Sequence, residues 1–93
     1  MYESCSPEDV AWAFGELRAQ SSLMYTEPSP LDAWPDAPIV DIRGDRDRLV
    51  SPAWAARAVP DRLGVESIVI EGAGHSPMLS HPRTLAELLL AAA

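Results

Sequence analysis

Two loops of this sequence carry the side chains best suited to catalysis, an aspartate and a histidine. The first loop, residues 44–52, contains Asp45 and Asp47, and the second, residues 72–82, contains His75 and His81. An aspartate that accepts the Nδ1–H of a histidine fixes the tautomer of the imidazole and stabilises the imidazolium. Such a pair forms the acid and base of a nucleophilic triad. The two residues therefore predict acid–base chemistry at a nucleophile, if the fold brings the loops together.

Short apolar runs precede both loops and predict a parallel sheet. Residues 38–43 and 67–71 have the composition of strands, and the capping pair Ser51-Pro52 begins a helix between them. A strand–helix–strand unit of this length places its strands parallel, with both carboxyl ends at one edge of the sheet. Ligands of open α/β sheets bind at that edge, so an aspartate of the first loop and a histidine of the second are expected to meet there. The predicted fold class is α/β, although a parallel sheet usually has more than two strands.

An N-terminal helix is predicted to begin at Ser6-Pro7, which repeats the capping serine followed by proline. The apolar stripe of this helix includes Phe14 and Leu17, and the helix is expected to end near residues 21–22. The N-terminal part of the chain thus contributes one amphipathic helix.

Prolines shape the rest of the chain. Four of them make residues 26–38 an irregular connection, and Pro60 is expected to break or restart the crossover helix. Residues 85–90 are expected to form a C-terminal helix.

Composition narrows the possible partners. The 93 residues include 14 acidic side chains and 7 arginines, with no lysine, for a formal net charge of −7. This charge repels phosphate backbones and anionic lipid surfaces, so neither nucleic acid nor membrane is an expected partner.

The single cysteine, Cys5, allows no internal disulfide. The first residues lack the pattern of a signal peptide and no apolar run could span a bilayer, so a cytoplasmic location is expected.

The order of the motifs resembles the C-terminal end of the α/β-hydrolases. Gly-x-x-Asp-x-x-Val-x-Pro spans residues 44–52, Gly-x-Gly-His spans residues 72–75, and a Pro-x-x-Leu-Ala helix start follows at residue 82. The stretch from His75 to Pro82 is similar to that of the esterase, methylesterase and hydroxynitrile-lyase branch. By this resemblance, residues 1–37 are a cap-type helix and Pro-rich connection, and residues 38–93 are the C-terminal βαβα part of the domain.

The resemblance implies hydrolysis of a small carboxylic ester, with Asp47 as the triad acid, His75 as the base, and no metal or organic cofactor. In this fold the serine nucleophile precedes the acid along the chain, within Gly-x-Ser-x-Gly. That motif does not occur in this sequence, so the nucleophile and its oxyanion hole are expected to be absent and the chain alone to have little activity. We therefore interpret the chain as the C-terminal part of a larger enzyme.

Two other functions stay open. The exposed edges of a two-stranded sheet favour association, so the chain is alternatively a non-catalytic interaction module that binds an N-terminal complement or a second copy of itself. Hydroxynitrile-lyase chemistry on the same triad would need a cationic group near the substrate, and the absence of lysine weakens this hypothesis.

Alternatives also exist for single residues. Asp45 is a rival for the acid position, but it is expected to pair with Arg46 or Arg48 on the surface. His81 precedes a proline and is expected at a helix start, without a catalytic or metal-binding role.

The sequence also predicts a substrate pocket. In the complete fold, Phe14 and Leu17 of the N-terminal helix and Leu49 beside the acid are expected to line a pocket for the acyl group.

Overall fold

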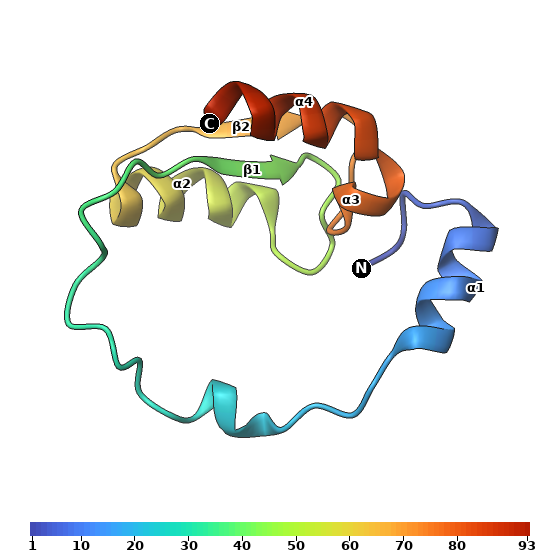
Figure 1. Ribbon diagram of the computed structural model, residues 1–93, viewed down its shortest axis with the longest axis horizontal. Helices are drawn as coiled ribbons and strands as arrows, with labels where there is room; N and C mark the ends of the chain where they lie inside the picture. Colours follow the sequence, from blue (N-terminus) through green and yellow to red (C-terminus); the bar gives the residue numbers. More distant parts are fainter.

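Two parallel strands and the helices around them form the folded part of the chain. The computed structural model describes residues 1–93, with β1 at Asp41–Gly44, α2 at Pro52–Leu63 and β2 at Ser67–Ile70. The strands pair in parallel, in a register that starts with Asp41 opposite Ser67. Figure 1 shows α2 and the C-terminal helix α4 (Pro82–Ala92) on opposite sides of this sheet. The predicted partial α/β fold is confirmed.

Serine–proline pairs start three of the helices. Ser6 precedes α1 (Pro7–Glu16) and accepts a hydrogen bond from the backbone N–H of Asp9 at 3.1 Å. Ser51 does the same for α2, although its bond from the N–H of Trp54 is longer, at 3.4 Å. The third helix, α3 (Pro77–Ser80), is one turn that was not expected, because four residues are too few to show an apolar period.

The first strand and the first helix both differ from their expected ranges. β1 begins at Asp41 rather than near residue 38, because β2 begins at Ser67 and offers no partner to the residues before Asp41. α1 ends at Glu16, and Leu17 already has an extended backbone with ψ 137°. A short 3-10 helix, η1 (Ser22–Tyr25), is the only regular element between α1 and β1.

Pro60 lies inside α2 and does not break it, contrary to the expectation. Proline removes one backbone donor from a helix, but α2 continues for only three residues beyond it. The last turn is closed by the N–H of Gly64, which donates to the carbonyl oxygen of Pro60 at 3.0 Å. Gly64 has a φ of 69°, the left-handed backbone that commonly ends a helix.

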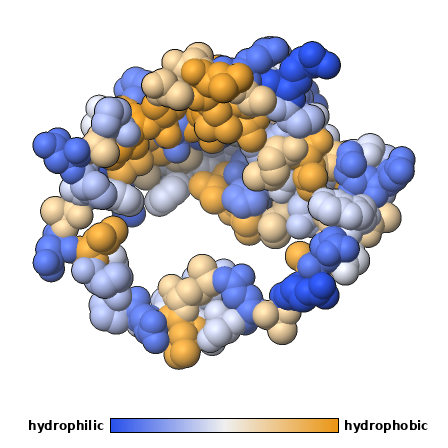
Figure 2. Space-filling view, in the orientation of Figure 1, coloured by the Kyte–Doolittle hydropathy of each residue, from blue (hydrophilic) through white to orange (hydrophobic).

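The molecule is open rather than closely packed. Only 8 of its 93 residues are buried, and every residue from 14 to 38 is exposed. This segment leaves α1, swings away from the sheet in a wide arc and returns to β1, and Figure 2 shows the opening that it encloses. Apolar surface gathers mainly over the strands and their helices. None of the helices combines the length and the apolar character that crossing a membrane requires.

Candidate active site

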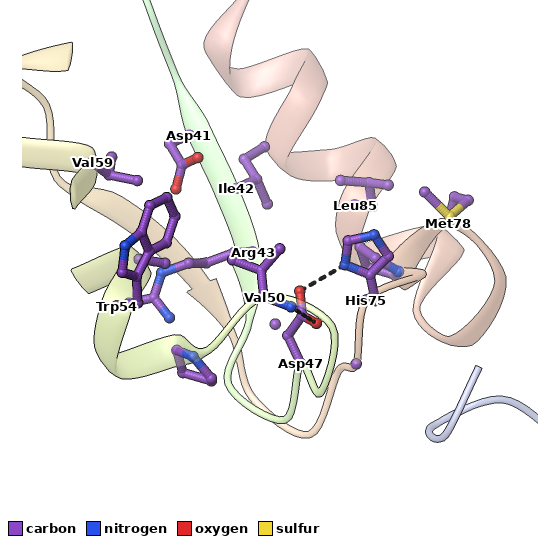
Figure 3. A pocket seen from close by; sticks show the side chains of 15 residues that line it. Asp41, Ile42, Arg43, Asp47, Val50, Trp54, Val59, His75, Met78 and Leu85 are labelled. Carbon is purple, nitrogen blue, oxygen red and sulfur yellow. Dashed lines mark hydrogen bonds and ion pairs between the residues drawn. The ribbon is translucent and has the colours of Figure 1, made fainter. Parts of the chain in front are cut away.

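An aspartate and a histidine from two different loops form a hydrogen-bonded pair at the carboxyl ends of the strands. Nδ1 of His75 lies 2.8 Å from Oδ2 of Asp47, as Figure 3 shows. The Asp47 side chain is 11% exposed and that of His75 is 31% exposed, so solvent still reaches the imidazole. An ionised carboxylate can only accept, so Nδ1 carries the proton and a neutral imidazole keeps Nε2 free to act as a base.

The loop after β1 holds the carboxylate of Asp47 in place. Its Oδ1 accepts hydrogen bonds from the backbone N–H groups of Leu49 at 2.8 Å and Val50 at 2.9 Å. Burial favours the neutral acid, but the hydrogen bonds from His75 and from these two N–H groups outweigh burial and lower the pKa of Asp47. The carboxylate therefore stays charged and directs Oδ2 toward the imidazole.

The two loops are also tied directly to each other. Oδ1 of Asp45 accepts from the N–H of Gly72 at 2.7 Å, and the N–H of Arg46 donates to the carbonyl oxygen of Ala73 at 2.9 Å. Asp45 forms no ion pair with Arg46 or Arg48, so the surface pairing expected from the sequence is wrong. The carboxylate of Asp45 instead accepts the hydrogen bond from the backbone N–H of Gly72 in the glycine-rich loop.

Gly44 sits where the two loops come closest. A Cβ at this position would overlap the carbonyl group of Ala73 and lie 2.6 Å from the carbonyl oxygen of Gly74. The absence of a side chain thus allows the acid loop to run against the histidine loop, which brings Asp47 within reach of His75.

Glu3 is a member of this region that the sequence did not reveal. Its Oε1 accepts from the N–H of Arg48 at 3.0 Å, and its Oε2 pairs with the N-terminal amine at 2.9 Å. The hydrogen bond from that amine is the main reason why the pKa of Glu3 falls to about 2. The contact joins residues 45 positions apart, and no local pattern in the sequence signals it.

A cavity of about 390 Å³ lies beside the Asp47–His75 pair. Its walls come from β1, from α2 and from the region of α3 and α4, and Figure 3 labels Asp41, Ile42, Arg43, Asp47, Val50, Trp54, Val59, His75, Met78 and Leu85 among the lining side chains. Arg43 provides a cation in this cavity, which sequence reasoning did not locate.

The three expected pocket residues lie elsewhere. Phe14 packs edge-on against Tyr2 with ring centroids 6.0 Å apart, and Leu17 lines a separate hollow beside α1. Leu49 is 58% exposed and does not line the cavity. The cavity beside the Asp47–His75 pair is lined by Val50 and Trp54 instead, and the acyl pocket expected for the complete fold stays a prediction.

The second histidine is separate from this pair. His81 forms the junction between α3 and α4, as expected for a residue at a helix start, and its Nδ1 lies 2.8 Å from Oγ of Ser80.

Cys5 is a free thiol, and burial, with the charges of Asp9 and Glu3, raises its pKa. This thiol is accordingly a poor nucleophile.

The fold and the site together define an α/β protein with a hydrogen-bonded aspartate and histidine at the carboxyl edge of a parallel sheet. The family model described as "Alpha/beta hydrolase family" matches residues 1–88. The chain belongs to the alpha/beta hydrolase family. Searches of curated proteins and of solved structures found no match.

Proposed function

We propose that this chain supplies the acid and the base of a Ser-Asp-His triad that hydrolyses a small carboxylic ester. The hydrogen bond of 2.8 Å between Asp47 and His75, in a member of the alpha/beta hydrolase family, is the observation that carries the proposal. The serine would come from a nucleophile-bearing segment outside these 93 residues, since Gly-x-Ser-x-Gly does not occur among them.

In the proposed reaction, Nε2 of His75 takes the proton of the serine hydroxyl as its oxygen attacks the ester carbonyl. The imidazolium then returns this proton to the departing alcohol, which leaves an acyl-serine. A water molecule hydrolyses the acyl-serine by the same two proton transfers and restores the serine. Asp47 stays ionised throughout, orients the ring and stabilises its positive charge.

The size and the apolar lining of the cavity suit the acyl or alcohol group of a small ester. Val50, Trp54, Met78 and Leu85 give apolar walls to the cavity that His75 also lines, and the imidazole side chain is 31% exposed. Apolar walls favour the organic part of an ester over water, and the charged pair provides the polar groups that orient it.

The test is to restore a complete enzyme. This chain would replace the corresponding C-terminal part of a family esterase that contributes Gly-x-Ser-x-Gly, and hydrolysis of p-nitrophenyl acetate would be followed. We expect ester turnover that falls roughly 10³-fold or more in the His75→Ala variant. His81→Ala is the matched control and should retain activity. Equal activity of the His75→Ala variant and the parent would disprove the role of His75.

A second function, association with another chain, is favoured by one specific observation. β1 has β2 as its one partner, so its other edge offers unpaired backbone groups along the cavity.

A further inference from the structure

Glu3 lies between the two loops that carry the Asp47–His75 pair. Its Oε1 accepts a hydrogen bond from the backbone N–H of Arg48 at 3.0 Å, and Arg48 directly follows Asp47. On the other loop, a Cβ added at Gly74 would lie 3.0 Å from the same oxygen, and Gly74 directly precedes His75. The carboxylate of Glu3 thus adjoins both the residue after the acid and the residue before the base.

The hydrogen bond to Glu3 anchors the acid loop at the peptide group that joins Asp47 to Arg48. The next two N–H groups, of Leu49 and Val50, donate to Asp47 itself, so these bonds set its side chain only relative to its own loop. The two backbone N–H donors that tie the loops directly together involve residues of the acid loop that precede Asp47. Glu3 therefore supplies the anchor that follows the acid.

Contacts with α1 and the histidine loop hold the turn that carries Glu3. The N–H of Cys5 closes this turn by donating to the carbonyl oxygen of Tyr2 at 3.0 Å. The Tyr2 ring packs edge-on against Phe14 of α1, and Tyr2 lines the hollow beside α1 together with Ser76. Figure 1 shows the N-terminal residues passing beside α3 on their way to α1. Side chains therefore hold the turn in addition to the pairing of Oε2 with the amine.

We propose that Glu3 is a positioning residue for the Asp47–His75 pair, which it holds together by fixing the N–H of Arg48 against the histidine loop at Gly74. Glu3 does not contact His75, so it acts through the placement of Asp47. A displacement of about 1 Å can cost an enzyme 10²-fold in rate, so an anchor next to the acid affects the reaction. This kinetic consequence rests on the proposed ester hydrolysis, whereas the effect on the geometry of the pair does not.

The first experiment measures the tautomer of His75 by ¹⁵N NMR in the chain alone, at a pH where the ring is neutral. In Glu3→Ala, Asp47 is held less firmly, and the ratio of the Nδ1-protonated to the Nε2-protonated ring should fall roughly 3–10-fold, the equivalent of one lost hydrogen bond. Glu3→Gln keeps an oxygen acceptor for Arg48 and should restore the pattern of the parent. Glu27→Ala is the matched control, because it removes the same charge from an exposed residue after η1.

A second variant displaces the Glu3 carboxylate without changing Glu3. The Cβ of Gly74→Ala would come within 3.0 Å of Oε1, which is the end of a flexible side chain, so the substitution should lower the tautomer ratio in the same direction. If this effect passes through Glu3, the double variant Glu3→Ala/Gly74→Ala should match Glu3→Ala alone. Acetylation of the N-terminus removes the charge that pairs with Oε2 and should leave the ratio unchanged.

The kinetic experiment uses the reconstituted esterase, in which the amine of Met1 becomes part of a peptide bond. Glu3→Ala should lower kcat roughly 10-fold and leave KM within about two-fold, because the acid–base pair and not the binding of the ester is affected. Glu3→Gln and Glu27→Ala should keep the kcat of the parent.

The outcomes separate this role from a purely structural one and from the proposed function. An unchanged tautomer ratio in Glu3→Ala, a Glu3→Gln variant as impaired as Glu3→Ala, or additive effects of Glu3→Ala and Gly74→Ala would each overturn the positioning role. A reconstituted parent without ester turnover, together with the expected tautomer ratios, would refute the ester hydrolysis and support the role of Glu3. Full turnover in both the parent and Glu3→Ala would do the opposite.

Discussion

Replacing Asp47 with asparagine tests the central feature of the site, the tautomer of His75. The substitution keeps the shape of the side chain and leaves its amide oxygen able to accept from the N–H groups of Leu49 and Val50. The amide NH₂ then replaces the Oδ2 that lies 2.8 Å from Nδ1 of His75. Because an NH₂ group only donates, Nδ1 must become the acceptor, and the proton of the neutral ring moves to Nε2.

Two magnitudes follow from this geometry. A hydrogen bond to a charged group contributes about 1.5–3 kcal/mol, and screening by water at the partly exposed imidazole reduces this, so we expect Asp47→Asn to lower the free energy of unfolding by about 1 kcal/mol. In a reconstituted enzyme the effect on kcat should be far larger, roughly 10⁴-fold, because the wrong tautomer has no basic Nε2. A large loss of rate with a small loss of stability is the signature of an orienting carboxylate.

The assay for the tautomer is ¹⁵N NMR of the imidazole in the chain alone, at a pH where the ring is neutral. The parent should show a protonated Nδ1 and an unprotonated Nε2, and Asp47→Asn should reverse the two. Asp45→Asn is the matched control, because its oxygen can still accept from the N–H of Gly72 and it does not contact His75. An unchanged ¹⁵N pattern in Asp47→Asn would refute the reasoning.

Three further predictions concern the stability of the fold. Gly44→Ala should lower the free energy of unfolding, measured in urea, by about 1–3 kcal/mol, because the new Cβ would overlap the backbone of the histidine loop. Gly15→Ala, whose Cβ would have nothing within 4 Å, should raise the free energy of unfolding by about 0.5–1 kcal/mol. Similar effects at both sites would contradict the close approach of the two loops at Gly44. Because the pKa of Asp47 is lower in the folded state, the unfolded state binds more protons in acid. The ionised carboxylate therefore stabilises the fold at pH values above the ordinary pKa of 3.8, and this stabilisation is lost as the pH falls through the folded-state pKa. Urea unfolding between about pH 2 and 6 should show a smaller loss of stability in Asp47→Asn than in the parent, because Glu3, whose pKa is also lowered, contributes to the loss in both. Ser51→Ala should cost about 0.5–1 kcal/mol through the lost helix cap, and an unchanged melting temperature would show that its bond of 3.4 Å contributes nothing.

Features set by neighbouring residues were predictable from the sequence. Ser6-Pro7 and Ser51-Pro52 start helices where expected, because capping and the fixed φ of proline act within one turn. The expected topology also holds, since a strand–helix–strand unit of this length has one favoured handedness. This topology predicted that an aspartate of the first loop and a histidine of the second lie close together, and the spacing of the family motif selected Asp47 and His75, which are in contact.

Features that depend on distant contacts were not predictable. The start of β1 depends on the register with β2, and the role of Asp45 depends on a free N–H in the next loop. Pro60 was also predicted wrongly, but for a local reason: the helix tolerates the lost hydrogen bond because its end is close and capped by Gly64.

The sequence by itself thus determined the fold class, since the class follows from local patterns and from the topology that they impose, and the resemblance of its motifs singled out Asp47 and His75. The tertiary structure alone decided that Glu3 contacts the acid loop and that the cavity beside the Asp47–His75 pair contains Arg43. The physical reason is that hydrogen bonds and buried charges depend on which atoms are adjacent in space. For residues far apart in the chain, that adjacency exists only once the strands have paired and the loops have met.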